Sequence, residues 1–424
     1  MSDLLNKLPD SDWRLRDSTR AVMAALEAAR SQAPDLTGPL ARFVGGCVRN
    51  QLLNQKVDDI DIATPLIPLQ VIAALETAGI KAVPTGIDHG TITAVADGRP
   101  YEITTLRRDV ETDGRRAVVA FSTDWTGDAQ RRDFRLNAIY ADADGTLFDP
   151  VGGIADALAG RVVFIGAAED RIREDYLRIL RFFRFSAWYG GGALDADGLA
   201  ACARLADGMQ GLSVERVWKE FKKLLAARDP RNALQAMESS GILRRLMPEA
   251  PGAAMLDRLI AAQLNAEPKA RTFDPLPRFM ALLLEEDKGA IAAARLKMSN
   301  EEKDRLAAGL SRDGVAMPPL SERSARAALY RLGPQAFSDR LVLALSNASG
   351  DADTARYKTM RAFAQNWTPP KLPVNGDDLA RAGVKPGPAM GVTLRAVEQW
   401  WIDNDFPSDR KTLLAKAKEL SAPF

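Results

Sequence analysis

The sequence predicts an α+β protein in which a small mixed α/β head is followed by an all-helical neck, body and tail. Two features of the chain support this prediction. Between Ala41 and about Pro150, short β-branched segments alternate with helical patterns. Beyond residues 161–166, a last short strand-like run, strand signals almost vanish. The chain there is rich in Ala, Leu and Arg at helical spacing, with breaks at Pro and Gly.

The individual elements follow from local patterns. Residues 18–30 combine a helical apolar period with strong helix formers, so they should form a helix. In the head, alternating and β-branched segments predict strands at residues 41–44, 59–63, 80–84, 90–97, 100–106 and 145–149. Helices are expected between them, at residues 47–54, 67–78 and 127–140.

Junctions rich in Gly and Pro divide the chain further. They lie at residues 149–156, 228–230 and 368–373. The predicted parts are an N-terminal helical extension (1–40), the head (41–150), a helical neck (151–228), a helical body (229–368) and a helical tail (369–424).

Bulk composition excludes several classes of protein. A chain of 424 residues is too long for one core, so two to four domains are expected. Two cysteines and one histidine make neither a disulfide framework nor a His-based metal cluster. No apolar run could span a bilayer and no signal pattern opens the chain, which predicts a cytoplasmic protein without membrane contact. With a net charge of +1, any nucleic-acid partner must be held by local basic patches.

The most informative stretch is GGCVRNQLLNQKVDDIDIAT, residues 45–64. Its first half is typical of a strand end, a tight turn and a helix start, so Gly45 and Gly46 would offer bare N–H groups to a phosphate. Its second half should be a strand, on which Asp59 and Asp61 project to the same face. Two adjacent carboxylates repel unless a cation lies between them, and hard oxygen ligands suit Mg²⁺. The combination indicates phosphoryl or nucleotidyl transfer, and the alternative is a turn followed by an exposed acidic strand end.

The order GG-x-VR, a short helix and D-x-D resembles the polymerase-β nucleotidyltransferase superfamily. Within it, the chain is most similar to the class II tRNA nucleotidyltransferases (CCA-adding enzymes) and the bacterial poly(A) polymerases. The resemblance implies that Arg49 binds the triphosphate. The family usually has an acid after this arginine, whereas this chain has Asn50.

Three further features of the head bear on the site. Glu102 is the single acid of the strand at residues 100–106, a natural third carboxylate, and in the superfamily such a residue helps to activate the attacking hydroxyl. The alternative is an ordinary charge on an edge strand. His89 belongs to an HGT that the resemblance includes, but a histidine in a turn is more often only hydrogen-bonded. Residues 107–126 are long, polar and Gly-punctuated, so a loop is expected; in the family this is the flexible loop that moves between C and A addition.

Residues 131–137 (RRDFRLN) are expected to open a helix. Cations and amides beside a bound triphosphate would hold phosphate and ribose. The motif resembles RRDFTxNA, with Arg135 where Thr is common. The resemblance implies that Arg132 binds the nucleotide while Asp133 and Asn137 shape the ribose site. The alternative is a solvated amphipathic helix.

Residues 171–184 (RIREDYLRILRFFR) carry the second strong signal. In a helix, Arg178, Arg181 and Arg184 form a row at steps of three. Such a row repels itself and therefore needs an anion, for which a triphosphate or a tRNA end is suitable.

Asp175 and Arg178 could read a base without a template. A carboxylate only accepts hydrogen bonds, so it selects the exocyclic amine of cytosine or adenine, and a guanidinium selects the neighbouring ring acceptor. Uracil and guanine would place a carbonyl against the carboxylate, at a cost of about 1–3 kcal/mol or more. Residues 174–178 match EDxxR, the nucleotide-recognition motif of the class II family. On spacing alone, an ordinary i,i+3 salt bridge explains the pair equally well.

Two other segments are interpreted structurally. Residues 212–220 resemble a family segment, LSxERxxxE, that stabilises the neck helices, with Ser213 as a helix N-cap. Residues 374–391 resemble the tail of bacterial CCA-adding enzymes, where free N–H groups could meet a tRNA phosphate; a turn between two helices is the simpler interpretation.

The resulting hypothesis is a CTP(ATP):tRNA nucleotidyltransferase that adds or repairs the 3′-terminal CCA of tRNA, with two Mg²⁺ ions held by Asp59 and Asp61. A poly(A) polymerase or an A-only-adding enzyme of the same fold is the nearest alternative, and a non-catalytic tRNA-binding protein is another. The sequence leaves the oligomeric state open.

Overall fold

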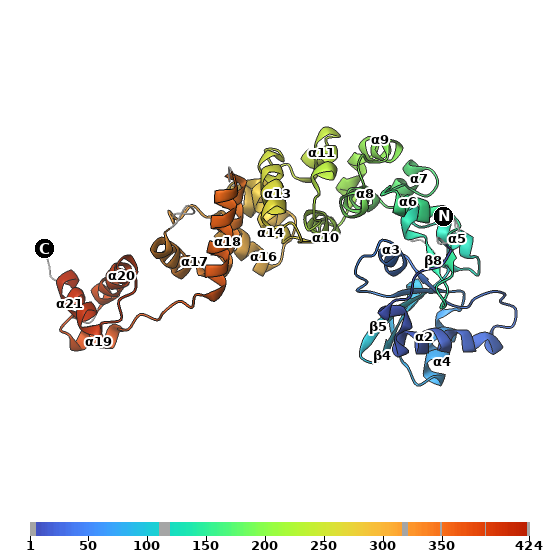
Figure 1. Ribbon diagram of the computed structural model, residues 1–424, viewed down its shortest axis with the longest axis horizontal. Coiled ribbons are helices and arrows are strands. Elements are labelled where there is room, and N and C mark those ends of the chain that lie inside the picture. Colours follow the sequence, from blue (N-terminus) through green and yellow to red (C-terminus); the bar gives the residue numbers. More distant parts are fainter. Residues whose placement is uncertain (1–5, 110–118, 316–320, 348–349, 386, 422–424) are drawn as a thin grey trace. The chain divides into compact units, whose positions relative to one another are not determined.

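The computed structural model describes residues 6–109, 119–315, 321–347, 350–385 and 387–421 (Figure 1). The chain forms two compact units. The first comprises Met1–Leu224 and Asn232–Arg245, and the second comprises Leu225–Arg231 and Leu246–Phe424. An α/β segment followed by helices confirms the predicted fold class. The finer division into five parts stays a prediction.

A seven-stranded mixed sheet forms the centre of the first unit, with the strand order β3-β4-β5-β2-β1-β8-β9. Strands β2 and β5 run parallel, and the other neighbouring pairs run antiparallel. The strands are β1 (Arg42–Val44), β2 (Asp61–Thr64), β3 (Lys81–Gly86), β4 (Thr91–Ala96), β5 (Arg99–Thr105), β8 (Tyr140–Ala141) and β9 (Leu147–Phe148). A separate antiparallel pair joins β6 (Arg107–Asp109) to β7 (Val119–Phe121).

Helices α2 (Asp17–Ala28) and α4 (Pro68–Thr77) pack against each other and against β4 (Figure 1). The predicted helix at residues 18–30 is therefore confirmed. Tyr101 of β5 joins this layer to the sheet, because its hydroxyl lies 2.9 Å from Ser18 Oγ and 3.1 Å from Thr19 Oγ1. The preceding short helix α1 (Asp12–Leu15) contributes Trp13, whose ring meets Phe43 edge-on at 4.9 Å. The N-terminal extension thus shares the core of the head.

The six strands predicted in the head are present, within about two residues of their predicted limits. The helices expected at residues 47–54 and 67–78 are also present, as α3 (Gly46–Leu52) and α4. One boundary matters for the site, because β2 begins at Asp61 and leaves Asp59 in irregular backbone before the strand.

The helix predicted at residues 127–140 is wrong. Helix α5 (Trp125–Gln130) ends early, and a turn leads to a short 3₁₀ helix, Arg135–Asn137, before β8. Phe134 explains the break: its backbone pairs with Phe164 in an isolated bridge, and its buried ring packs against Phe164 at 4.8 Å. Burying an aromatic ring outweighs the local helix preference.

Two further expectations change. Residues 161–166 do not form a strand, since the isolated bridge at Phe164 is the sheet-like pairing found there. Residues 107–126 are not wholly a loop, because β6 and β7 pair at its two ends and α5 begins at Trp125. Residues 110–118, the middle of the predicted flexible loop, lie outside the described residues.

Seven α-helices follow the sheet between residues 153 and 246: α6 (Gly153–Leu158), α7 (Ala168–Glu174), α8 (Leu177–Tyr189), α9 (Ala196–Arg204), α10 (Val214–Leu225), α11 (Arg231–Ser239) and α12 (Ile242–Leu246). Helix α8 positions the site, because its apolar face is buried and Phe182 stacks on Phe164 at 5.5 Å. The opposite face of α8 carries the arginines.

The second unit is helical. Its helices are α13 (Ala254–Ala266), α14 (Pro275–Leu283), α15 (Glu286–Arg295), α16 (Asn300–Leu310), α17 (Glu322–Ala344, broken at Gly333), α18 (Asp351–Asn366), α19 (Gly376–Arg381), α20 (Pro388–Asp403) and α21 (Arg410–Ser421). Arg278 of α14 is fully buried and donates hydrogen bonds to Gln263 Oε1 and to the carbonyls of Leu225, Ala227 and Arg228. In the described part of the chain, no helix is long and apolar enough to cross a bilayer.

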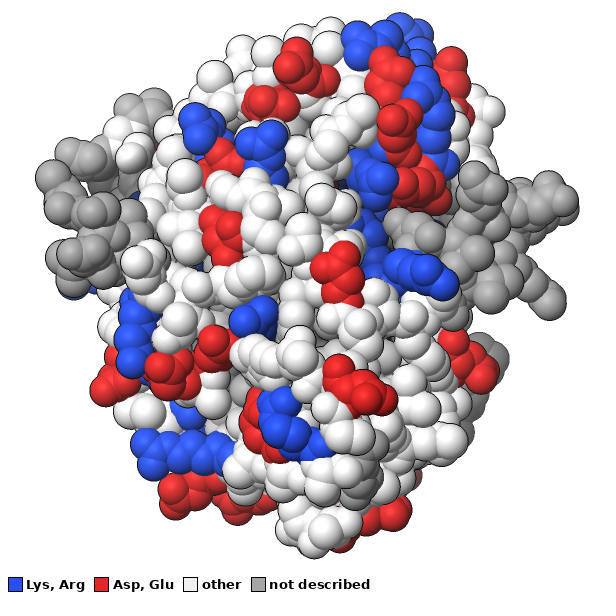
Figure 2. Space-filling model, turned by 90° about the vertical axis from the view of Figure 1, so that its right-hand side faces the viewer, with Lys and Arg blue, Asp and Glu red and all other residues white. Residues whose placement is uncertain are grey.

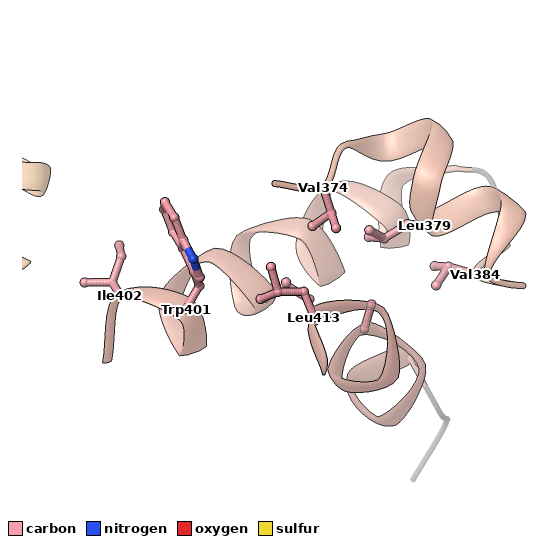
Figure 3. Packing of buried hydrophobic residues seen from close by; sticks show 8 residues of the cluster. Val374, Leu379, Val384, Trp401, Ile402 and Leu413 are labelled. Atoms are coloured by element: carbon pink, nitrogen blue, oxygen red, sulfur yellow. The ribbon is translucent and has the colours of Figure 1, made fainter. Parts of the chain in front are cut away.

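The end of the chain has its own small core. Val374, Leu379, Val384, Trp401 and Leu413 are buried together. Figure 3 shows these side chains, which come from helices α19 to α21, the turn after α19 and the segment just before it. Asn375 caps α19 in a reciprocal pair with Asp378. Part of residues 374–391 therefore has a clear structural role, whereas a phosphate contact there stays a prediction.

Candidate nucleotide-binding site

A cavity of about 620 Å³ lies in the first unit, between the β1–α3 turn, the turn before β8 and the α7–α8 junction. It brings together residues that are up to 178 positions apart, from Gly45 to Lys223. Most of the predicted site residues line it: Gly45, Gly46, Arg49, Asp61, Arg132, Asp133, Asn137, Asp175, Arg178, Arg181 and Arg184. Asp59 and Glu102 do not line the cavity, although both act electrostatically on Asp61.

The turn between β1 and α3 closes one wall. Gly45 has φ +69 and ψ −117, a backbone conformation that residues with a side chain rarely adopt. Its N–H donates to the carbonyl of Ile139 at 3.1 Å, which ties the turn to the chain entering β8. The sharp turn directs α3 back along the sheet, so Arg49 on its last turn reaches the cavity.

The acids lie on the edge formed by β2 and β5. Asp61 is paired in parallel register with Glu102, so their side chains leave neighbouring strands on the same face. Asp59 precedes the strand and is exposed. The prediction that Asp59 and Asp61 alternate along one strand is therefore wrong. Asp61 and Glu102 form the pair instead, on the neighbouring strands β2 and β5, and Asp59 lies just before β2.

Electrostatics mark this edge as a place for a cation. The pKa of Asp61 rises to about 6, mainly because the carboxyl is buried and then because Glu102 and Asp59 are negative, although Arg132 and Arg49 lower it. A carboxylate that is hard to ionise beside two like charges gains most from a divalent cation. Within the described residues, no three His, Cys, Asp or Glu side chains form a metal cluster. The acids thus fit a cation that draws its other ligands from water or phosphate.

A hydrogen-bonded chain runs from the turn to α8. Arg49 donates to Asn137 Oδ1, and Asn137 Nδ2 donates to Asp133 Oδ1 at 2.9 Å. Asp133 Oδ2 then accepts from Arg181 Nε at 2.7 Å. Asp133 and Asn137 of the 131–137 motif are therefore linked to each other, although the α-helix predicted for them is absent.

Arg131 and Arg132 share one buried acid, Asp128. Arg131 lies 2.7 Å and Arg132 3.0 Å from its two oxygens, and Tyr140 donates to it at 2.8 Å. Burial alone would raise the pKa of Asp128, but the two guanidiniums lower it below its usual value. Both arginines are therefore held by a fixed anion at the cavity wall.

The α7–α8 junction differs from the continuous helix that was predicted. Asp175 has extended backbone angles of −154° and 104° and separates α7 from α8. Its Oδ1 accepts from the Leu177 N–H at 3.1 Å, and its Oδ2 accepts from Arg216 at 2.7 Å. Arg178 instead pairs with Glu174 and donates to the carbonyl of Arg171 at 2.9 Å. Asp175 and Arg178 both line the cavity, but each is held by a different partner.

The expectation that the arginine row of α8 needs a bound anion is also wrong. Arg178 pairs with Glu174, Arg181 with Asp133, and Arg184 with Glu220 at 2.6 Å. These acids come from other elements or from the preceding helix, so the row is largely neutralised within the protein. Figure 2 shows the same mixing on one face of the molecule, where basic and acidic side chains are interspersed.

Five further residues line the cavity that were not among the predicted site residues: Arg131, Leu177, Phe185, Arg216 and Lys223. Phe185 lies under three guanidiniums, those of Arg184 at 4.1 Å and of Arg49 and Arg181 at 5.3 Å. Arg216 belongs to the segment 212–220 that was interpreted as structural, and its spacing from Asp175 gave no signal. His89 is exposed and lies outside the cavity lining, in a short 3₁₀ turn before β4.

Known proteins resemble the chain over most of its length. Residues 41–163 match the poly A polymerase head domain, and residues 193–252 match the probable RNA and SrmB-binding site of polymerase A. The CCA-adding enzyme of Limosilactobacillus fermentum is 33% identical over 95% of this chain and 97% of its own. The mitochondrial CCA tRNA nucleotidyltransferase 1 of Mus musculus is 34% identical over 89% of this chain and 86% of its own.

The fold agrees with a solved member of the same group. The Bacillus stearothermophilus CCA-adding enzyme, determined in complex with CTP, superimposes with a TM-score of 0.75 at 28% identity, over 96% of this chain and 98% of that one. The chain therefore belongs to the family of CCA-adding enzymes, which are nucleotidyltransferases.

Proposed function

We propose that this chain adds or repairs the 3′-terminal CCA of tRNA, using CTP and ATP as substrates. One observation carries the proposal: a strand carboxylate, a set of guanidinium groups and the two base-reading residues line a single cavity. Its volume of about 620 Å³ lies within the range of pockets that hold ligands of nucleotide size.

The nucleoside triphosphate would be held by its charge. Gly45 and Gly46 bring bare backbone to the cavity, and Arg49 and Arg132 supply positive charge beside it. Asp133 and Asn137 would shape the ribose site, because their side chains are buried and fixed by each other. Arg181 and Arg184 line the same cavity from α8 and would contact the nucleotide with the N–H groups that their ion pairs leave free.

Asp175 and Arg178 would read the base. Each carboxylate oxygen of Asp175 accepts one hydrogen bond from the protein and keeps a lone pair for an exocyclic amine. Arg178 retains N–H donors for the neighbouring ring acceptor of cytosine or adenine. UTP and GTP would set a carbonyl against the carboxylate and leave both acceptors unpaired.

In the reaction, the tRNA 3′-oxygen bonds to the α-phosphorus and the bond from that phosphorus to the pyrophosphate oxygen breaks. The hydroxyl proton would leave toward the carboxylates of the β2–β5 edge, with Glu102 as the assisting base. Asp59 and Asp61 would hold two Mg²⁺ ions, which neutralise phosphate oxygens and make the hydroxyl more acidic when bound. The arginines of the cavity wall would stabilise the charge on the departing pyrophosphate.

The test uses the full-length chain and tRNA lacking its last three nucleotides, with each radiolabelled nucleoside triphosphate alone and in combination. The proposal expects CMP incorporation from CTP alone, AMP incorporation only after CTP is supplied, and no use of UTP or GTP. Asp59→Ala should abolish incorporation and leave tRNA binding nearly intact. Incorporation from ATP alone would indicate the poly(A) or A-only alternative, and no metal-dependent pyrophosphate release would indicate a binding protein.

A further inference from the structure

Tyr189, the last residue of α8, contacts the guanidinium of Arg49 on α3. Arg49 Nη2 donates to the Tyr189 hydroxyl at 2.7 Å, and the guanidinium carbon lies 4.0 Å from the centre of the Tyr189 ring. One side chain therefore holds both the edge and the face of the same cation. Tyr189 is not among the described residues that line the cavity, so its effect on a ligand there must pass through the residues that it contacts.

Two further contacts fix Tyr189 itself. Its ring stacks on Phe185, one turn earlier in α8, with the ring centroids 5.6 Å apart and an angle of 27° between the planes. Its hydroxyl donates to Asn50 Oδ1 at 3.2 Å, and the Asn50 amide donates to the Lys56 carbonyl at 3.0 Å. The hydroxyl thus uses its proton on Asn50 and a lone pair on Arg49. Ring and hydroxyl are both held, so Tyr189 gives Arg49 a fixed support.

The residue at position 50 makes this support more important. The family usually has an acid after this arginine, whereas Asn50 is a neutral acceptor, and a carboxylate binds a guanidinium more strongly than an amide does. Asp133 acts on Arg49 electrostatically, but a charge without a hydrogen bond does little to orient a planar group. Direct contacts orient it instead: Asn137 at Nη1, Asn50 at Nε and Nη2, and Tyr189 at Nη2 and on the ring face.

We infer that Tyr189 is a positioning residue for the nucleotide, because it holds Arg49 from α8 so that the guanidinium faces the phosphates of the substrate. The inference rests on the proposed function, since it takes a nucleoside triphosphate as the ligand. It also joins the helix after the glycine turn to the end of α8, and both of these elements contribute to the wall of the same cavity.

The experiment removes the contact in two steps and measures dissociation constants of the full-length protein without tRNA, by calorimetry. Tyr189→Phe keeps the ring and loses the hydroxyl, so affinity for CTP should fall about threefold. Tyr189→Leu loses both, so affinity should fall about tenfold. Because Arg49 would act on phosphate charge, the loss in Tyr189→Leu should be smaller for CDP and smallest for CMP.

A double-mutant cycle separates positioning from a structural role. In an Arg49→Met background, Tyr189 has no guanidinium to hold, so adding Tyr189→Leu should leave the dissociation constant for CTP unchanged. Phe183→Leu is the matched control, because it also removes an aromatic ring from α8, where Phe183 is fully buried against Phe182. This control should lower the melting temperature and keep the CTP affinity of the wild type.

The outcomes distinguish the inference from the proposed function. A loss in Tyr189→Leu that follows the number of phosphates, with no further loss in the Arg49→Met background, supports the role of Tyr189. Equal losses for CTP, CDP and CMP, an additive loss in the double variant, or the same loss in Phe183→Leu overturns it and leaves the proposed function intact. If Arg49→Met binds CTP too weakly to measure, the order of the three losses decides alone. Failure of the wild-type protein to bind CTP overturns the proposed function itself.

Discussion

Replacing Asp61 by Asn should make the protein more stable while abolishing its activity. Asp61 is ordinarily a carboxyl of pKa 3.8, and in the folded chain its pKa is about 6. The difference means that folding the ionised carboxyl costs about 3 kcal/mol, which the neutral amide avoids. Because the residue is not fully buried, solvent screening reduces the expected gain to about 2 kcal/mol.

The sign of the pH dependence follows from the direction of the shift. Folding raises the pKa of Asp61, so the cost is fully present above about pH 6 and disappears as the pH falls toward 3.8. The free energy of unfolding of the Asp61→Asn variant should therefore be higher than that of the wild type at about pH 7.5 and equal to it near pH 4. Adding Mg²⁺ at the higher pH should stabilise the wild type alone, because the amide is a poorer ligand.

Hydrogen exchange of the backbone amides of β2 and β5 measures this change in stability within the first unit, with a chelator present to remove divalent metal. Asp58→Asn is the control, since Asp58 is exposed and paired with Lys56, and it should change nothing. Glu102→Gln should give a smaller gain, because Glu102 is the second cause of the shift after burial. Equal stability of Asp61→Asn and wild type at about pH 7.5, or a stability gain that persists near pH 4, would contradict this prediction.

Three other perturbations test different parts of the chain. Arg216→Met should lower kcat/KM for CTP about tenfold and leave tRNA binding unchanged, because Asp175 loses its charged partner; an unchanged kcat/KM for CTP would count against this role. Arg278→Leu leaves four hydrogen-bond acceptors without their donor and should destabilise the second unit by about 3–5 kcal/mol in urea denaturation, whereas a change below about 1 kcal/mol would contradict it. Trp401→Ala should cost about 3–5 kcal/mol and raise hydrogen exchange in α19, α20 and α21, whose side chains share its core; protection that stays unchanged there would disprove it.

Local sequence patterns were sufficient to predict most of the helices and strands of the head. The strands of the head and the helices α2, α3 and α4 follow from apolar period and turn residues, which act over a few neighbouring positions. The same holds for the glycine turn, whose backbone angles at Gly45 only glycine adopts easily. Motif spacing also selected eleven of the residues that line the cavity.

Tertiary contacts decided the rest. Phe134 leaves the predicted helix because its partner, Phe164, is thirty positions away, and Asp175 breaks another helix while Arg216 holds its carboxylate. Likewise, the sequence shows a row of arginines but not the acids from other elements that neutralise it. Charge pairing depends on distances between distant residues, so the partner of each guanidinium is a property of the folded chain alone.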